Sequence, residues 1–167
     1  VANQGIEAWI DDQMTVPQSQ TLDRLNEVFA EVIEWYLVNG GNPDEVSTRP
    51  YWTIFNYTWW ENHMKNDDLL RQKVALALSE IFVISIESNL SDAGFGLADY
   101  YDILLKHSFG NFEDMLREIS LHPCMGYYLS HLNNPREIPE ENIHSDENYA
   151  REIMQLFTIG LYELNQD

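Results

Sequence analysis

Positively charged side chains are scarce in this sequence. Its 167 residues include nine lysines and arginines against 28 aspartates and glutamates, so the formal net charge is −19. Such a charge repels the phosphates of nucleic acid and the anionic surface of a membrane. We therefore expect no nucleic-acid partner, and we interpret most of the charge as a means of keeping the surface solvated.

Cysteine and long hydrophobic runs are scarce as well. Cys124 is the single cysteine, which excludes an intrachain disulfide and a thiolate metal cluster. We expect it to be a small buried thiol between helices rather than a nucleophile. The longest apolar stretch, residues 74–86, is interrupted by polar residues and is shorter than the roughly 20 residues of a membrane-spanning helix, so we predict no membrane insertion.

Sequence motifs of known enzymatic mechanism are absent. There is no phosphate-binding loop, dinucleotide fingerprint, His-Glu-x-x-His zinc motif or Gly-x-Ser-x-Gly elbow. Glu141 and His144 have the Glu-x-x-His spacing of di-iron bundles, but a proline-containing segment surrounds them and a second such pair is missing. We therefore predict neither a metal site nor a cofactor.

Apolar side chains recur at helical spacing along most of the chain. Hydrophobic residues make up 44% of the sequence, which is enough to build the core of one domain. The pattern predicts a single all-α domain, an irregular bundle of about eight helices. The expected helices cover residues 6–14, 21–39, 51–63, 68–86, 97–107, 112–121, 123–132 and 146–159.

The helix expected at residues 68–86 is apolar nearly all round beyond Val74, which is typical of a central, buried helix. A buried strand at residues 81–86 is the alternative, because β-branched residues are frequent there. Helix-terminal residues fit the remaining pattern. Thr21, Asp67 or Asp68, and Asn111 suit N-caps, and Gly160 suits a C-terminal cap.

An aromatic segment begins at residue 51. Trp52, Phe55, Trp59 and His63 fall on one stripe of the expected helix. We predict that this stripe packs in the core, because aromatic side chains dominate core energetics. Stacking against a sugar or a cofactor is the alternative.

The densest polar chemistry lies near the start of the last expected helix. Glu147 and Arg151 are four residues apart with the acid N-terminal, which favours an ion pair. One interpretation is a capped helix with a surface ion pair, and the other is a polar site in a cleft between helices. The candidate site residues are His122, His144, Asp146, Glu147, Asn148, Arg151 and Glu152.

Several of the few basic residues, including Arg71 and Arg151, lie in the expected helices among acidic residues. An arginine beside a buried helix usually has a carboxylate partner. We therefore predict that Arg71 or Arg151 pairs with Glu118, Glu147 or Glu152 and so ties two helices together.

Several segments together resemble the large bacterial family known as domain of unknown function 1800. They are LRQKVALALSEIFV at residues 70–83, YYD at 100–102, HSFGNF at 107–112, LHPCMG at 121–126 and, most specifically, DENYAREIMQLFTIG at 146–160. The resemblance implies an exported protein of several hundred residues, often encoded beside a sulfatase-like partner, of which this chain is an N-terminal portion. It implies no catalytic role for any residue.

Two functions follow as hypotheses. The first is a non-catalytic binding or scaffold module of an exported bacterial protein that engages a protein partner. The alternative is part of a hydrolase-like or metal-assisted enzyme whose polar site lies at the start of the last helix. A piece of a larger helical domain should also expose apolar surface, with Leu156, Phe157, Leu161 and Tyr162 as candidates, and this surface would support a homodimer.

Overall fold

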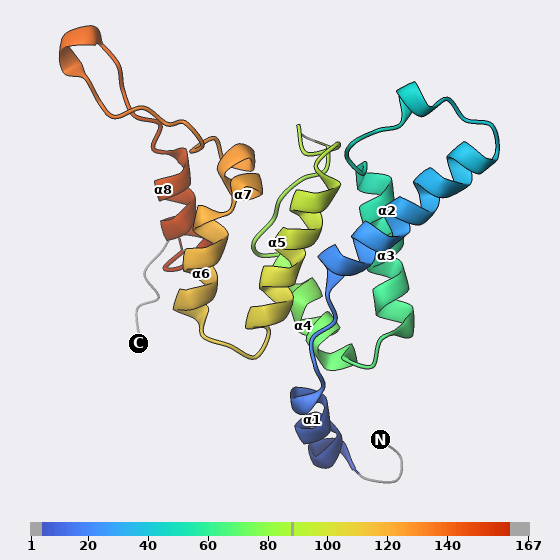
Figure 1. Ribbon diagram of the computed structural model, residues 1–167. Coiled ribbons are helices and arrows are strands. Elements are labelled where there is room, and N and C mark those ends of the chain that lie inside the picture. Colours follow the sequence, from blue (N-terminus) through green and yellow to red (C-terminus); the bar gives the residue numbers. More distant parts are fainter. Residues whose placement is uncertain (1–4, 88, 161–167) are drawn as a thin grey trace.

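The computed structural model describes residues 5–87 and 89–160. This part of the chain contains eight α-helices and no β-sheet, which confirms the all-α prediction (Figure 1). An isolated antiparallel bridge joins Ile138 to Ile143. The helices are α1 (Ile6–Thr15), α2 (Thr21–Val38), α3 (Trp52–Lys65), α4 (Leu69–Ser79), α5 (Gly94–His107), α6 (Phe112–Leu121), α7 (Pro123–Tyr128) and α8 (Asn148–Glu152).

Helix α5 lies at the centre of the fold. It packs against α2, α3, α4, α6 and α7 (Figure 1). Its side chains Tyr100, Tyr101, Leu104 and Leu105 are all buried, as their spacing predicts. The prediction of a central helix at residues 68–86 is therefore wrong in position, because α5 contributes more of the core than α4 does.

Helix α4 ends at Ser79, and residues 80–86 form neither a helix nor a strand. The backbone N–H groups of Ile81 and Phe82 both donate to the carbonyl oxygen of Leu78, which closes the last turn. The Phe82 carbonyl oxygen then accepts a hydrogen bond of 2.8 Å from the Tyr100 hydroxyl of α5. The β-branched residues that follow disfavour a helix, and this tertiary contact fixes the chain in an irregular path.

The start of α5 lies against Pro50, two residues before the start of α3. The Gly94 N–H donates to the Pro50 carbonyl oxygen at 3.0 Å. A Cβ atom at position 94 would lie 2.5 Å from that oxygen, so glycine is required for this close approach. This contact begins α5 three residues before its predicted start at Leu97.

The N-terminus of α2 is capped by a side chain of α5. The Asp102 carboxylate accepts hydrogen bonds from the backbone N–H groups of Thr21 (2.7 Å) and Leu22 (2.9 Å). The helix begins at Thr21 as expected, but the Thr21 side chain provides no cap. The capping carboxylate comes from a residue 81 positions away, so this contact both caps the N-terminus of α2 and joins α2 to α5.

The N-terminus of α4 has a similar long-range arrangement. Asp68 does not cap α4, contrary to the prediction. One of its carboxylate oxygens accepts hydrogen bonds from the N–H and the hydroxyl of Ser19, both at 2.9 Å. The Leu70 N–H donates instead to the side-chain oxygen of Gln13 in α1 at 3.0 Å. These contacts hold the α1–α2 connector against α4.

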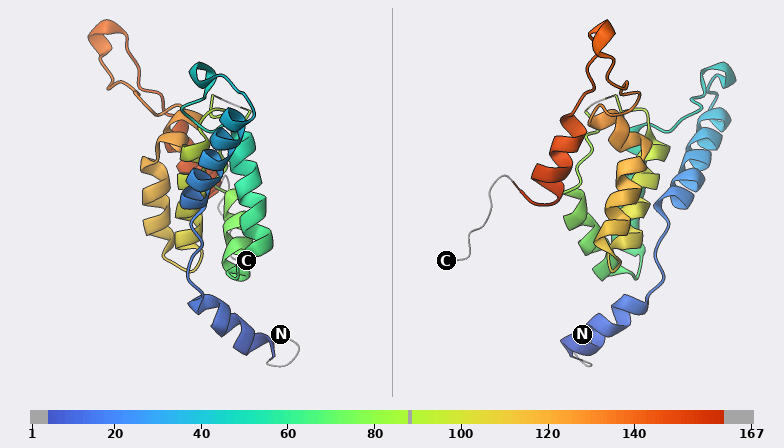
Figure 2. Two further views of the ribbon diagram at one scale, coloured as in Figure 1. Left: turned by 45° about the vertical axis from the view of Figure 1, so that its right-hand side comes forward. Right: turned by 90° about the vertical axis from the view of Figure 1, so that its left-hand side faces the viewer.

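The chain beyond α6 is less compact. Helix α7 ends at Tyr128, four residues before the predicted end, and residues 135–145 project away from the helices (Figure 2). After α8, residues Ile153–Phe157 form a π-helical turn in place of the predicted α-helix to residue 159. Gly160 ends this turn with a φ of 79°, as its predicted capping role requires.

Candidate functional site

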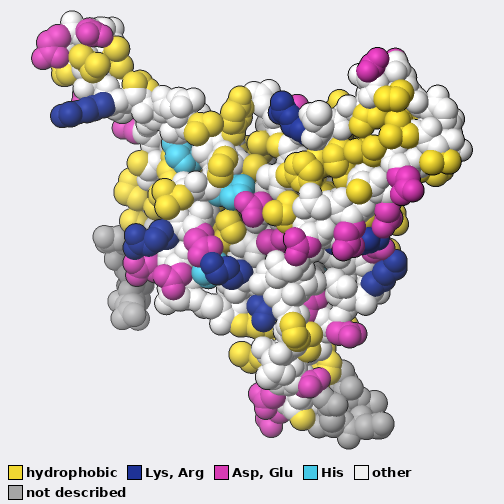
Figure 3. All heavy atoms as spheres, viewed as in Figure 1, with side chains coloured by type: hydrophobic (Ala, Val, Ile, Leu, Met, Phe, Trp, Pro, Cys, Tyr) yellow, Lys and Arg dark blue, Asp and Glu magenta, His cyan; other side chains and the backbone are white. Residues whose placement is uncertain are grey.

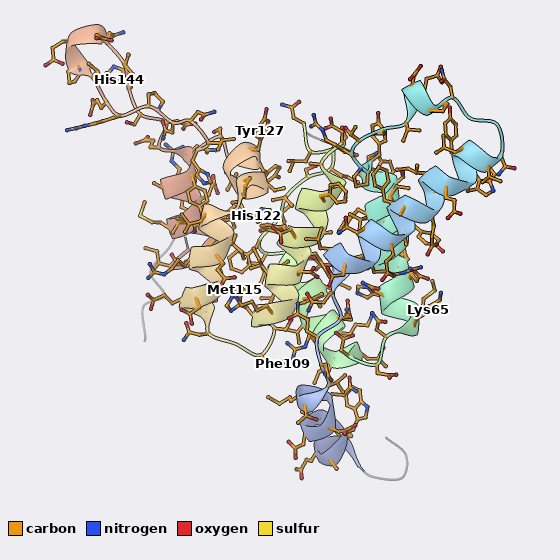
Figure 4. The ribbon with its side chains drawn as sticks, viewed as in Figure 1. Lys65, Phe109, Met115, His122, Tyr127 and His144 are labelled. Atoms are coloured by element: carbon orange, nitrogen blue, oxygen red, sulfur yellow. The ribbon has the colours of Figure 1, made fainter. Side chains whose placement is uncertain are left out.

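The structure separates the two histidines of the predicted polar site. His122 lies buried beside α5, whereas His144 lies in the projecting segment (Figure 4). The His144 side chain is 70% exposed, and its Nδ1 atom is 3.5 Å from the Glu137 carboxylate. The seven predicted site residues therefore do not converge on one point.

His122 occupies a structural position at the start of α7. Its Nδ1 atom accepts a hydrogen bond from the Cys124 N–H at 3.2 Å, and this contact with the backbone places the proton of the neutral ring on Nε2. That Nε2–H faces the Asp99 carboxylate at 3.2 Å. Burial lowers the pKa of His122, and the bond to Asp99 opposes this effect in part. His122 is thus a neutral helix cap under neutral conditions.

Cys124 is buried, as predicted. Burial, with a smaller contribution from Asp99, raises the pKa of its thiol to about 11. The thiol is therefore protonated at neutral pH and is a poor nucleophile.

Asp146 closes the base of the projecting segment. Its carboxylate accepts hydrogen bonds from the Ser130 hydroxyl at 2.7 Å and from the Asn148 N–H at 2.9 Å. The Asn134 side chain bonds to both the N–H and the carbonyl oxygen of Asp146. The hydrogen bonds from Ser130 and Asn148 lower the pKa of Asp146. These contacts give Asp146 and Asn148 a structural role at the start of α8.

Glu147 and Arg151 form the predicted ion pair, at 2.7 Å, on the solvent-exposed side of α8. Glu152 lies apart from them, in a shallow hollow beside Tyr128 and Leu156. The ion pair joins two turns of one helix, so it does not tie two helices together.

Arg71 does not pair with any of the predicted carboxylates. Its guanidinium donates to the Leu105 carbonyl oxygen at 2.9 Å and lies 4.6 Å from the centre of the Phe109 ring. The prediction of an interhelical ion pair by Arg71 or Arg151 is therefore wrong. An interhelical ion pair is formed instead by Arg24 of α2, whose Nε lies 2.8 Å from the Glu61 carboxylate of α3.

The described residues contain no cluster of three or more His, Cys, Asp or Glu side chains able to hold a metal ion. Among the helices of residues 5–87 and 89–160, none combines the length and the apolar character needed to cross a membrane.

The strongest candidate site is an apolar groove between α2 and α3. It has a volume of about 470 Å³. Val28, Val32 and Trp35 line it from α2, and Ile54 and Tyr57 line it from α3. The Trp35 and Tyr57 side chains are 67% and 58% exposed. We call this surface the α2–α3 groove.

Acidic side chains accompany the groove along α2. Glu31 lies in the wall of the groove itself. Arg24 is held by three carboxylates, those of Glu27, Glu31 and Glu61, so its positive charge is already neutralised. Figure 3 shows hydrophobic side chains gathered over α2 above a row of acidic ones. The groove thus combines exposed aromatic side chains with one lining carboxylate, Glu31, which shares Arg24 with two other carboxylates.

Sequence reasoning missed the α2–α3 groove. The sequence predicted a helix at residues 21–39 but no exposed apolar surface on it, whereas Val32 is 41% exposed and Trp35 is 67% exposed. The available signal was Trp35, a large aromatic residue on a helix that also carries several acidic residues.

The apolar surface predicted near the C-terminus is present in part. Leu156 is 62% exposed, as expected, but Phe157 is buried, and its ring lies 5.0 Å from that of Phe82. Leu161 and Tyr162 lie outside the described residues.

No curated protein and no solved structure matches this chain. A family described as "Protein of unknown function (DUF1800)" matches residues 1–167, which is the whole sequence. The resemblance noted in the sequence motifs is therefore confirmed, and the chain belongs to the DUF1800 family.

Proposed function

We propose that this chain is a non-catalytic protein-binding module whose α2–α3 groove receives a basic, amphipathic helix of a partner protein. The observation that carries the proposal is the exposure of Trp35 and Tyr57 on either side of one apolar groove. Tryptophan and tyrosine are the residue types most enriched at binding hot spots, and large exposed apolar patches mark interaction sites.

The shape of the groove favours a helix as the bound element. Val28, Val32 and Trp35 are spaced by four and three residues along α2, so they form one continuous wall. A partner helix with apolar side chains at the same spacing would fit between this wall and α3, as in helix-in-groove recognition.

The charge favours a basic partner. The chain has a net charge of −19, and Glu31 lies in the groove wall. A second copy of this chain would bring an equal negative charge to the interface, whereas lysines or arginines flanking an apolar stripe would be attracted. The family resemblance supports placing this module in an exported bacterial protein.

The test is a titration with two synthetic helical peptides that share one leucine stripe and carry either lysines or glutamates on their flanks. We expect the lysine peptide to bind. Its affinity should fall as salt is added, because screening reduces the electrostatic attraction. We expect the glutamate peptide not to bind. The double variant Trp35→Ser, Tyr57→Ser should bind the lysine peptide at least tenfold more weakly.

Leu121→Ser is the matched control, because Leu121 is 80% exposed on α6. Equal loss of binding in this control would indicate nonspecific adsorption and would overturn the proposal. Self-association in sedimentation that disappears with Trp35→Ser would identify a second copy as the occupant and would overturn it as well.

A further inference from the structure

A second cavity, separate from the α2–α3 groove, lies between α3, α5 and residues 82–86. It has a volume of about 300 Å³. Phe55 and Trp59 line it from α3, Tyr100 and Leu104 line it from α5, and Ile84 closes one side. We call this cavity the aromatic pocket.

The aromatic pocket is partly open to solvent, and Trp60 in its wall is 59% exposed. An apolar cavity of about 150 Å³ is enough to hold benzene. The aromatic pocket therefore has room for a molecule roughly twice that size, at the lower end of the range for ligand sites.

The wall of the pocket is uncharged. None of its described lining residues is Asp, Glu, Lys, Arg or His, although 37 of the 167 residues of the chain are Lys, Arg, Asp or Glu. A charged ligand would lose its hydration there without gaining a counter-charge, which is strongly unfavourable. The pocket therefore selects an uncharged ligand.

Polar groups in the wall are available to orient a ligand. The Tyr101 hydroxyl is buried without a hydrogen-bond partner among the described residues, and the partly exposed Asn56 also lines the pocket. By contrast, the Tyr100 hydroxyl already donates to the Phe82 carbonyl oxygen, and the Ser79 hydroxyl donates to Leu76. An amide both donates and accepts, so it suits a ligand with one N–H or O–H group.

The wall is also held in place before any ligand binds. The Tyr100–Phe82 hydrogen bond fixes the 82–86 segment to α5. The rings of Trp59 and Trp60 meet edge to face at 4.9 Å. A preformed wall reduces the entropic cost of binding.

We infer that the aromatic pocket binds one small, uncharged aromatic molecule that makes a hydrogen bond to Asn56. This assignment goes beyond the protein-docking role of the α2–α3 groove and does not depend on it. It also combines the two interpretations of the aromatic segment, since Phe55 and Trp59 both pack against the core and line the pocket.

The experiment uses indole and benzothiophene as probes in calorimetric titrations of the chain. The two molecules have nearly the same shape, but only indole carries an N–H group. We expect indole to bind with one-to-one stoichiometry and benzothiophene to bind several-fold more weakly. Indole-3-acetate, which is negatively charged, should not bind.

Two variants separate the pocket from nonspecific adsorption. Asn56→Leu keeps the size of the side chain and removes the amide. It should lower the affinity for indole about tenfold and leave the affinity for benzothiophene unchanged. Ser79→Leu places a larger side chain in the pocket and should abolish the binding of both probes, with circular dichroism confirming that the chain is folded.

Failure of indole to bind the unmodified chain would overturn the inference. Equal affinities for indole and benzothiophene that are unaffected by Asn56→Leu would overturn the assigned hydrogen bond and with it the ligand class. The lysine-peptide titration is independent of these results, because the aromatic pocket and the α2–α3 groove share no lining residue.

Discussion

Helices α2 to α5 and the segment of residues 130–160 are held together by different kinds of polar contact. In the helices and the chain segments just before them, carboxylates and amides with little exposure join residues far apart in the sequence. Asp102 reaches Thr21 across 81 positions, and Asp68 reaches Ser19 across 49. In the later segment the polar contacts of Asp146 are exposed and span 16 positions or fewer.

This difference shows that a high density of polar residues in the sequence does not mark a functional site here. The dense stretch at residues 144–152 forms a loop closure and a surface ion pair. The polar residues that join separate helices are scattered through the sequence, and their hydrogen bonds hold the helices of the bundle together. The exposed apolar groove lies on that bundle, where rigid helices fix its walls.

The largest contrast should come from apolar truncation. Leu104→Ala removes a fully buried side chain of α5 and should lower the free energy of unfolding by about 3–5 kcal/mol. Leu156→Ala, at a 62% exposed position, should change it by about 0.5 kcal/mol or less. Urea denaturation of the two variants measures both effects, and similar losses would remove the distinction between the regions.

The helix caps should give the next largest contrast. Asp102→Ala removes two hydrogen bonds to the start of α2, and we expect it to cost about 2–3 kcal/mol. Asp102→Asn keeps one acceptor and should recover part of this loss. Asp146→Ala, measured in the same denaturation experiment, should cost less than Asp102→Ala because its contacts are exposed.

The ion pair between α2 and α3 should make stability depend on pH. Hydrogen bonds from Arg24 and Lys65 lower the pKa of Glu61 to about 2 from an ordinary value of 4.5. Because the folded-state pKa is the lower one, the stabilisation is complete above pH 4.5 and is lost as the pH falls toward 2. Thermal unfolding of Glu61→Gln should therefore show a smaller loss of stability across this range than the unmodified chain.

The difference in stability between the unmodified chain and Glu61→Gln should therefore change between pH 4.5 and 2. A difference that stays constant over this range would contradict this role of Glu61. The experiment compares the two proteins at each pH, so the titration of the other carboxylates cancels to first order.

The smallest effect should come from the surface ion pair of α8. Glu147→Gln removes one partner of an exposed pair four residues apart, and we expect a change in unfolding free energy of about 0.5 kcal/mol or less. A loss of several kcal/mol in urea denaturation would show that α8 is more strongly coupled to the core than its exposed contacts indicate.

Local features of the fold could be predicted from the sequence. The spacing of Tyr100, Tyr101, Leu104 and Leu105 correctly identified their burial, and Asn111 caps α6 through the N–H groups of Glu113 and Asp114. These features depend on residues that are close in sequence, where helical periodicity and capping chemistry apply directly.

Features that depend on tertiary contacts could not be predicted. The cap of α2 is a carboxylate from α5, and the end of α4 is stabilised by a hydroxyl of α5. The groove between α2 and α3 depends on how these two helices are placed, since Trp35 and Tyr57 are 22 residues apart in the sequence. The motif at residues 146–160 identified the family, but not the position of the groove.

The measurement that tests the central claim most directly is the lysine-peptide titration of two double variants. One combines Trp35→Ser with Tyr57→Ser in the α2–α3 groove. The other combines Glu147→Gln with Arg151→Gln in α8, which leaves the net charge unchanged because one acid and one base are removed. We predict at least tenfold weaker binding for the groove variant and unchanged binding for the α8 variant. Unchanged binding for the groove variant with a loss for the α8 variant would contradict the account.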